Sequence, residues 1–419
     1  MPIPSHLPER LAITLWDFIW YTRTGPGEPF ADLDAAFAQA VARGYNTVRI
    51  CAMPYLLFGS GLDTGTLTFS PLGEYGRRTR WYDVRHRTVL DGRRHLLALF
   101  EAARRHDCHV IVSSWEYQQS SAFLDDPSWY EALRAVPAAG RANALADALA
   151  DLVDFLGEHG LADRVAFVEL HNEIQSTWLT EALEPGETPV LGLRPHLEEA
   201  IGRFKARRPD ELVTVNYAWV PVGEMRGIPA NLDVAVFHPY VYGVIDELID
   251  TFALRDTGRP FPQERAFREL LRPDAPPLAE WGPDQEWRAS ATVVPAREIY
   301  LHDWCDPERF DRWLYDRYAF YRYGMAERLR IWIDAAADHA AAAGVPLVLG
   351  EGYVGYTPLL GTFEEGPVGR AICLEAIGHA VRVGAWGAVV CSNAAPHHPM
   401  WQDVELQVTG TRLLTGARS

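Results

Sequence analysis

Short apolar runs of strand length alternate along the chain with longer segments whose apolar residues recur at helical spacing. One of the longer segments places Leu145, Leu149 and Leu152 on a single helical face. Such alternation is typical of repeated βα units built around a parallel sheet. The pattern predicts eight strands, at residues 11–16, 47–51, 109–114, 165–170, 212–217, 234–238, 347–351 and 387–392.

Eight strands separated by helices predict a (β/α)8 TIM barrel, whose active site lies at the carboxyl ends of the strands. We expect residues 1–419 to form one barrel domain, because the barrel needs about 250 residues and the remainder fits as insertions. The spacing is uneven in two places, at residues 53–91 after strand 2 and at residues 243–308 after strand 6. Loops longer than about 15 residues usually carry a function, so we expect both insertions to lie over the catalytic mouth.

The second insertion carries three tryptophans, Trp281, Trp287 and Trp304. Tryptophan is costly to leave in water, so a flexible linker is the weaker interpretation. We expect residues 244–308 to form an inserted loop or subdomain that packs over the active site.

The composition, 48% hydrophobic and 23% charged, is that of a soluble globular protein. A net charge of −17 with a single lysine, Lys205, argues against nucleic acid or an anionic membrane as a partner, since phosphate contact requires clustered basic residues. No run of 18 apolar residues is present, and the first ten residues lack a signal-peptide pattern. We therefore expect a cytoplasmic protein.

Two of the predicted strands lead into a glutamate, in residues 168–173 (VELHNE) and in residues 348–352 (VLGEG). The ends of barrel strands meet at one mouth, so Glu173 and Glu351 are expected to lie close together. One carboxyl group as proton donor and one carboxylate as nucleophile are what retaining glycoside hydrolysis requires. The alternative is a pair of solvated carboxylates without a catalytic role.

Four motifs in order resemble the clan A retaining glycoside hydrolases, which include the family 5 cellulases, and most closely the bacterial proteins called cellulase-like. Residues 169–173 resemble the strand 4 motif of the acid/base, and residues 350–352 resemble the strand 7 motif of the nucleophile. Residues 44–49 and 238–240 resemble the strand 2 arginine motif and the strand 6 His-x-Tyr motif. Two departures are Ile174, where the cellulases usually have proline, and Ser392, near which a tryptophan would be expected.

The resemblance implies a role for each motif residue. Glu173 would be the acid/base and Glu351 the nucleophile, which Arg49 and the hydroxyl of Tyr240 would keep ionised. Asn172 would bond the sugar 2-hydroxyl, and His238 would contact the sugar or the nucleophile. Arg49 could equally be a partner in a barrel ion pair, and Glu169 is expected to form such a pair with an arginine.

Aromatic residues near strand ends offer faces on which sugar rings stack, and we expect about half of them to line the pocket. Asp17 and Glu116, each directly after a tryptophan, could bind sugar hydroxyls or cap a following turn. The aromatic candidates are Trp16, Trp20, Trp115, Trp219, Tyr242 and Trp401.

Neither a metal nor another cofactor is expected. The five cysteines lack CxxC spacing, so they indicate neither a disulfide framework nor a zinc site. His397 and His398 are adjacent and cannot easily turn both rings toward one ion. We expect this pair to lie in a loop, with one ring at most touching sugar.

The sequence thus predicts a retaining glycoside hydrolase with a carbohydrate substrate. We expect exo action on small glycosides or oligosaccharides, since two insertions at the rim would close an open groove. The alternatives are a transglycosidase that uses the same covalent intermediate and a carbohydrate-binding barrel without activity. Neither the sugar nor the oligomeric state follows from the sequence.

Overall fold

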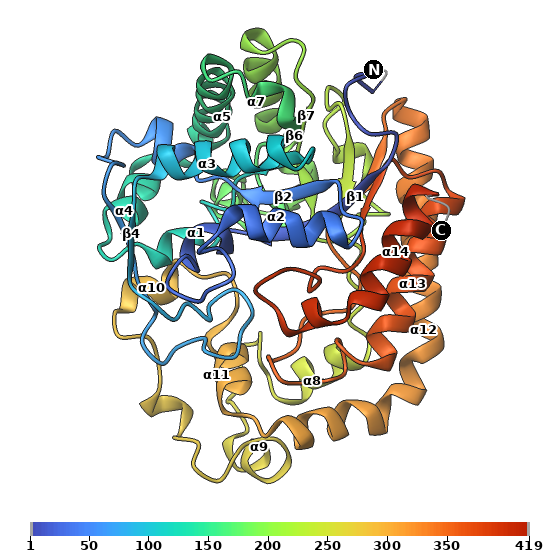
Figure 1. Ribbon diagram of the computed structural model, residues 1–419. Coiled ribbons are helices and arrows are strands. Elements are labelled where there is room, and N and C mark those ends of the chain that lie inside the picture. The colour runs from blue at the N-terminus through green and yellow to red at the C-terminus, as the bar shows by residue number, and fades with distance from the viewer. Residues whose placement is uncertain (1–2, 417–419) are drawn as a thin grey trace.

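Parallel strands form a barrel at the centre of the computed structural model, which describes residues 3–416 (Figure 1). The strand order is β7-β6-β5-β2-β1-β11-β10-β9-β8. The expected fifth strand is interrupted at Val215, so one part pairs with β6 and the other with β9, which closes the barrel. The strands are β1 (Leu11–Asp17), β2 (Thr47–Cys51), β5 (His109–Ser113), β6 (Val165–Glu169), β7 (Val213–Thr214), β8 (Asn216–Tyr217), β9 (Ala235–Phe237), β10 (Leu347–Leu349) and β11 (Gly387–Val389).

All eight predicted strands are present, and the (β/α)8 barrel is confirmed. Every residue of β1, β2, β5 and β6 is buried. Burial on both faces is what a parallel sheet covered by helices requires, and it explains why these strands read as continuous apolar runs. The strands β10 and β11 end two to three residues before the predicted limits, so Glu351 lies in the loop that follows β10.

Helices surround the barrel, as Figure 1 shows. One connection differs from the expected alternation, because β8 and β9 are joined by a segment whose only helical turn is Met225–Gly227. The helices between and after the strands are α2 (Leu33–Ala42), α3 (Gly92–Arg105), α5 (Arg141–Glu158), α7 (Arg194–Arg207), α12 (Pro307–Ala343), α13 (Pro367–Arg382) and α14 (Val404–Thr415).

The two long connections are folded segments that contact each other. After β2 come a π-helical turn, Tyr55–Gly59, and a hairpin of β3 (Leu67–Phe69) and β4 (Thr88–Leu90). The Asp303 carboxylate accepts hydrogen bonds from the backbone N–H groups of Gly76 (2.6 Å) and Arg78 (2.8 Å), and so joins the second connection to the first. The segment after β9 contains α8 (Val244–Thr251), α9 (Gln263–Glu269), α10 (Glu286–Ser290) and α11 (Ala296–Trp304).

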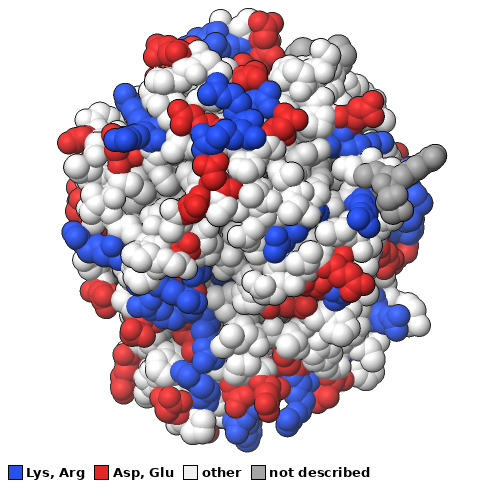
Figure 2. Space-filling view, in the orientation of Figure 1, with Lys and Arg blue, Asp and Glu red and all other residues white. Residues whose placement is uncertain are grey.

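Three further α-helices are short: α1 (Ile19–Thr22), α4 (Ser128–Ala135) and α6 (Pro189–Gly192). Within residues 3–416, no helix combines the length and the hydropathy needed to cross a membrane. The five cysteines are buried free thiols. On the face in Figure 2, acidic and basic side chains are interspersed, and neither sign covers a large continuous area.

Candidate active site

Glu351 is buried at the carboxyl end of β10, with two short hydrogen bonds to its carboxylate. Arg49 Nη1 donates to Oε1 at 2.8 Å, and the Tyr240 hydroxyl donates to Oε2 at 2.8 Å. Burial acts to raise the pKa of Glu351, but the electrostatic effects of His238, Arg49 and Arg80, together with the Tyr240 hydrogen bond, outweigh burial and lower the pKa. Glu351 is therefore held as a carboxylate.

The glycines beside Glu351 let the loop approach the site closely. A Cβ atom on Gly350 would lie 2.9 Å from both the His238 ring and the Val236 side chain. Gly352 has φ +153°, a conformation that other residues rarely adopt. Close packing at Gly350 and backbone geometry at Gly352 thus account for the two glycines that flank Glu351.

Glu173 lies across the barrel mouth from Glu351, beyond the end of β6. Its backbone N–H donates to Asn216 Oδ1 at 2.6 Å, where the fifth strand resumes after its interruption. The carboxylate is half-buried and contacts His238 Nδ1 at 3.0 Å and the Gln118 amide at 3.5 Å. One oxygen of Glu173, one oxygen of Glu351 and one ring nitrogen of His238 lie within 4.8 Å of one another.

Arg49 lies on β2 and connects three acceptors in the barrel interior. In addition to Glu351, its guanidinium donates to Glu169 Oε2 at 2.8 Å and to Asn172 Oδ1 at 2.7 Å. Asn172 in turn donates to Gln118 Oε1 at 3.0 Å. Because arginine can only donate, its contact fixes which side of the Asn172 amide carries the oxygen. The expected pairing of Glu169 with an arginine is confirmed.

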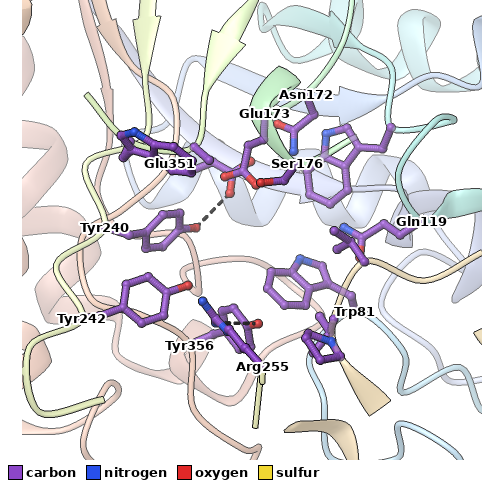
Figure 3. Close-up of a pocket in the computed structure, with 16 residues that line it drawn as sticks. Trp81, Gln119, Asn172, Glu173, Ser176, Tyr240, Tyr242, Arg255, Glu351 and Tyr356 are labelled. Atoms are coloured by element: carbon purple, nitrogen blue, oxygen red, sulfur yellow. Dashed lines mark hydrogen bonds between the residues drawn. The ribbon is translucent and has the colours of Figure 1, made fainter. Parts of the chain in front are cut away.

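A cavity of about 290 Å³ opens in front of the two glutamates. Figure 3 shows Glu173 and Glu351 on one side and aromatic rings on the others. The structure brings three of the six candidate aromatic residues to the wall, Trp115, Trp219 and Tyr242. The lining residues are Trp81, Trp115, Gln119, Asn172, Glu173, Ser176, Ala218, Trp219, Tyr240, Tyr242, Arg255, Val293, Val294, Pro295, Glu351 and Tyr356.

The other aromatic candidates lie elsewhere. Trp16 packs edge-on against Phe30 and at a tilt against Phe37. Trp401 stacks on Tyr45. Trp20, also buried, donates its ring N–H to a backbone carbonyl at 2.8 Å and stacks on His95. None of the three lines the cavity, and their faces are covered by protein.

Glu116 also lies away from the cavity. Its buried carboxylate accepts hydrogen bonds from the backbone N–H groups of Tyr55 (2.8 Å) and Leu56 (2.7 Å). These bonds hold the π-helical turn after β2, which precedes Glu116 in the chain, whereas the expected alternative was a cap on the following turn. Both residues follow the end of β5 at Ser113, in a loop that turns Trp115 toward the cavity and Glu116 toward the segment after β2.

Asp17 ends β1 with φ +53° and is buried behind the cavity wall. Burial and the negative charge of Glu351 raise the pKa of Asp17 to about 8. The two neighbouring carboxyl groups are therefore in opposite states near neutral pH, with Asp17 protonated and Glu351 ionised. The structure places Asp17 next to the site but not among the residues that line the cavity.

The sequence motifs missed the side chains that the two insertions contribute. Arg80, buried in the segment after β2, donates from Nη2 to the Tyr240 hydroxyl at 3.1 Å and stacks on Trp81 at 4.2 Å. Arg255 comes from the segment after β9 and lies 5.0 Å from the centre of the Tyr242 ring. No motif marks these loops, so no sequence signal pointed to either arginine.

The atoms of Glu173, His238 and Glu351 that cluster within 4.8 Å are of the types that bind metal ions. Arg49 already supplies positive charge at Glu351 from 2.8 Å, which disfavours a cation in the same place. His397 and His398 lie with perpendicular rings whose centres are 6.5 Å apart, and His398 contacts Glu365 at 3.1 Å.

Comparison with known proteins gives matches in sequence and in fold. Residues 13–201, a little under half of the chain, match a family model that is named cellulase-like and described as sugar-binding cellulase-like. No curated protein sequence gives a significant match. A crystal structure from Parabacteroides distasonis, named as a candidate glycoside hydrolase, has a TM-score of 0.70 at 17% identity and covers 97% of this chain and 94% of that chain.

Two further structures are more distant. A glycoside hydrolase family 5 enzyme from Prevotella bryantii has a TM-score of 0.52 at 11% identity, with 97% of each chain covered. An exo-β-1,4-mannosidase from an Opitutaceae bacterium has a TM-score of 0.50 at 14% identity, with 99% of this chain and 63% of that chain covered. The chain therefore has the TIM-barrel fold of glycoside hydrolases and, over residues 13–201, a cellulase-like sequence, which confirms the resemblance to the cellulase-like proteins.

Proposed function

We propose that this protein is a retaining glycoside hydrolase in which Glu351 is the nucleophile and Glu173 the acid/base. The observation that carries the proposal is the placement of two carboxyl groups, from the ends of β6 and β10, with oxygens within 4.8 Å of each other. Retaining enzymes separate these groups by about 5 to 5.5 Å, whereas inverting enzymes need about 6.5 to 9.5 Å to admit a water. The short separation favours retention.

The two glutamates differ in the way that double displacement requires. Glu351 is bound by an arginine and a tyrosine hydroxyl and has a lowered pKa, so it is ionised and ready to attack. Glu173 is half-buried, faces the cavity and contacts only His238 and Gln118 through its carboxylate. Its place at the cavity wall is where a donor must lie to reach the glycosidic oxygen.

The reaction would proceed in two steps. Glu173 protonates the glycosidic oxygen while Glu351 attacks the anomeric carbon, which breaks the bond to the leaving group and forms a glycosyl ester. Glu173 then takes a proton from water, and the water attacks the same carbon and frees Glu351. Asn172, oriented by Arg49 and Gln118, would bond the sugar 2-hydroxyl as the transition state forms.

The cavity supports a small substrate. Its volume of about 290 Å³ is at the lower end of the roughly 300 to 1,000 Å³ typical of ligand pockets. Trp115, Trp219 and Trp81 offer apolar faces for a sugar ring. Residues 244–308 contribute Arg255 and residues 293–295 to the wall, which supports their role as a subdomain over the site and favours exo action on glycosides or oligosaccharides.

A sugar-binding barrel without activity is the rival proposal, and the description of the matching family would suit it. Binding alone does not require two carboxyl groups this close together, one of them held as an anion by an arginine and a tyrosine hydroxyl. The contrast between Glu351 and Glu173 therefore favours catalysis, and the variants below separate the two proposals.

We expect Glu351→Ala to lose about 10⁴ or more in turnover of aryl glycosides, since a nucleophile acts within a coupled unit. Calorimetric titration with the released sugar should still detect binding. Glu351→Gln, which keeps the side-chain shape near Arg49, should behave in the same way and guards against simple misfolding. Near-normal turnover by both variants would remove Glu351 from the mechanism.

We expect Glu173→Ala to slow substrates with poor leaving groups far more than activated aryl glycosides, because only the former need a proton. Azide should restore part of the turnover by attacking the glycosyl ester. Glu184→Ala, which removes an exposed glutamate of the following loop, is the matched control. Equal losses on good and poor leaving groups would assign the proton to another residue.

Proton NMR of the first product from a soluble oligosaccharide should show retained anomeric configuration, because the two carboxyl groups are close together. The same spectra should show release of a terminal sugar before internal fragments. An inverted first product would contradict the double displacement. A rapid early fall in the viscosity of a soluble polysaccharide would contradict exo action.

Arg80→Gln should move the acid side of the kcat/KM profile to higher pH by about one unit. Arg80 is among the cationic groups that lower the pKa of Glu351, so its removal raises that pKa and Glu351 becomes protonated sooner as the pH falls. Arg85→Gln in the same segment, where the side chain is 58% exposed, is the control and should leave the profile unchanged. A loss of rate with an unmoved acid limb would mean that Arg80 acts only through packing.

A further inference from the structure

A second cavity, of about 480 Å³, opens among the loops that follow the neighbouring strands β2, β1, β11 and β10. Residues 23–29, 77–85, 359–360 and 396–399 contribute to its wall, and none of its lining residues lines the candidate active site. We call it the arginine cavity, because the charged side chains of its wall are Arg23, Arg77, Arg78, Arg85 and Asp83. Four arginines beside one acid stand out in a chain whose net charge is −17.

Two of the four arginines are balanced by carboxylates. Arg85 lies 2.7 Å from Asp83. The buried side chain of Arg23 lies 3.5 Å from Glu28, which stands behind the wall. These two pairs carry no net charge, so they contribute polar groups but no excess of positive charge.

The other two arginines, Arg77 and Arg78, keep their positive charge. The carboxylate nearest to Arg77 is that of Glu74, which is 87% exposed and 3.8 Å away. Arg78 forms no ion pair within residues 3–416. Asp303 binds the backbone N–H of Arg78, but burial raises the pKa of Asp303 to about 7, so it is only partly ionised at neutral pH. The wall therefore carries a net positive charge.

Both guanidinium groups are held in place and still have donors to spare. Arg77 Nη1 donates to the carbonyl of Val84 at 3.0 Å, and Arg78 Nη1 donates to the carbonyl of Cys305 at 2.9 Å. These are the only side-chain hydrogen bonds of the two residues in the described part of the chain. Because a guanidinium has five N–H donors, each arginine can still bind a ligand with its remaining N–H groups.

A buried histidine in the wall, His397, lacks a hydrogen-bond partner. Its Nδ1 is buried and contacts no acceptor or donor among residues 3–416. Burial holds the pKa of this ring well below its ordinary value, and the positive charges of Arg23 and Arg80 act in the same direction. Glu365, which contacts the neighbouring His398 at 3.1 Å, has a pKa raised by burial to about 8 and adds little negative charge. The surroundings of His397 are therefore positive, and an anion would be stabilised there.

The remainder of the wall is apolar. It consists of Leu359, Leu360 and the prolines Pro29, Pro396 and Pro399. Leu360 is 61% exposed and has φ +81°, a backbone conformation that is uncommon for a residue with a side chain. Strained backbone of this kind collects at ligand sites. The wall thus offers cationic groups to one part of a ligand and an apolar surface to another.

We propose that the arginine cavity binds a small organic phosphate, with its phosphate group on Arg77 and Arg78 and its carbon body against the leucines and prolines. The planar fork of a guanidinium matches two phosphate oxygens at once. A phosphate monoester carries about −1.5 to −2 charges at neutral pH, which two uncompensated arginines balance. The site is separate from the candidate active site, so the phosphate and a sugar bind at the same time.

Calorimetric titration of the full chain with phenyl phosphate and with inorganic phosphate, at low salt, tests this proposal. Phenyl phosphate should bind with a dissociation constant of about 1 mM or below. It should bind several-fold more tightly than inorganic phosphate, because its ring covers the apolar part of the wall. Benzoate has the same ring on a carboxylate with a single charge and should bind about tenfold more weakly than phenyl phosphate. Absence of saturable binding by phenyl phosphate overturns the proposal, and benzoate of equal affinity overturns the assignment to phosphate. Inorganic phosphate of equal affinity would overturn the role of the apolar wall.

A matched pair of variants at Leu360 locates the binding site. Leu360→Asp places a negative charge in the wall of the arginine cavity, and Leu360→Asn has the same shape without the charge. Both should keep the melting temperature, since the side chain is exposed. Phenyl phosphate should bind about five- to tenfold more weakly to Leu360→Asp than to Leu360→Asn. Equal binding by the two variants would place the phosphate elsewhere and overturn the proposal.

Arg77→Gln tests the cationic part of the wall. It should weaken the binding of phenyl phosphate and of inorganic phosphate by about tenfold each, because both lose the same charged hydrogen bonds. Arg259→Gln removes an exposed arginine that does not line the cavity and is the control, with binding unchanged. Wild-type affinity in a folded Arg77→Gln variant would overturn the placement of the phosphate group on Arg77.

Discussion

The guanidinium of Arg49 is the interaction on which both the barrel interior and the site depend. It is 1% exposed and bonds at once to Glu169 on β6, to Asn172 beyond that strand and to Glu351 beyond β10. A buried ion pair adds little net stability by itself, but removal of one partner leaves a charge without compensation at a cost of about 3–5 kcal/mol. Arg49 therefore ties three strands together and fixes the charge state of Glu351 through the same contacts.

The carboxyl groups near Arg49 have different surroundings and therefore different pKa values. Glu351 has hydrogen bonds and cationic neighbours that offset its burial, whereas in Asp17 burial prevails and the pKa rises to about 8. Glu173 keeps one edge toward the cavity and has no arginine contact within residues 3–416. Asp17 and Glu351, whose charges act on each other, thus hold different protonation states at one pH.

Side chains from the two insertions complete the candidate active site that the barrel strands form in part. Arg80 reaches the Tyr240 hydroxyl from outside the barrel, and Trp81, on which it stacks, faces the cavity. The contact of Asp303 with the first insertion joins the two inserted segments. In a TIM barrel the strands set the positions of charged groups and the loops shape the pocket, and here the loops also supply part of the charge.

The sequence by itself determined the barrel and its strand-end residues, because these depend on periodicity. A buried parallel strand is a continuous apolar run, so the positions of Glu173 and Glu351 followed from where two of these runs end. Arg49, in the middle of its strand, was marked by the resemblance to the strand 2 arginine motif. Only the tertiary structure decided which of two adjacent residues faces the cavity, Trp115 rather than Glu116. It alone placed Arg80, because a loop has no repeating pattern that relates its sequence to a position in space, and its side chains are placed by packing against distant segments.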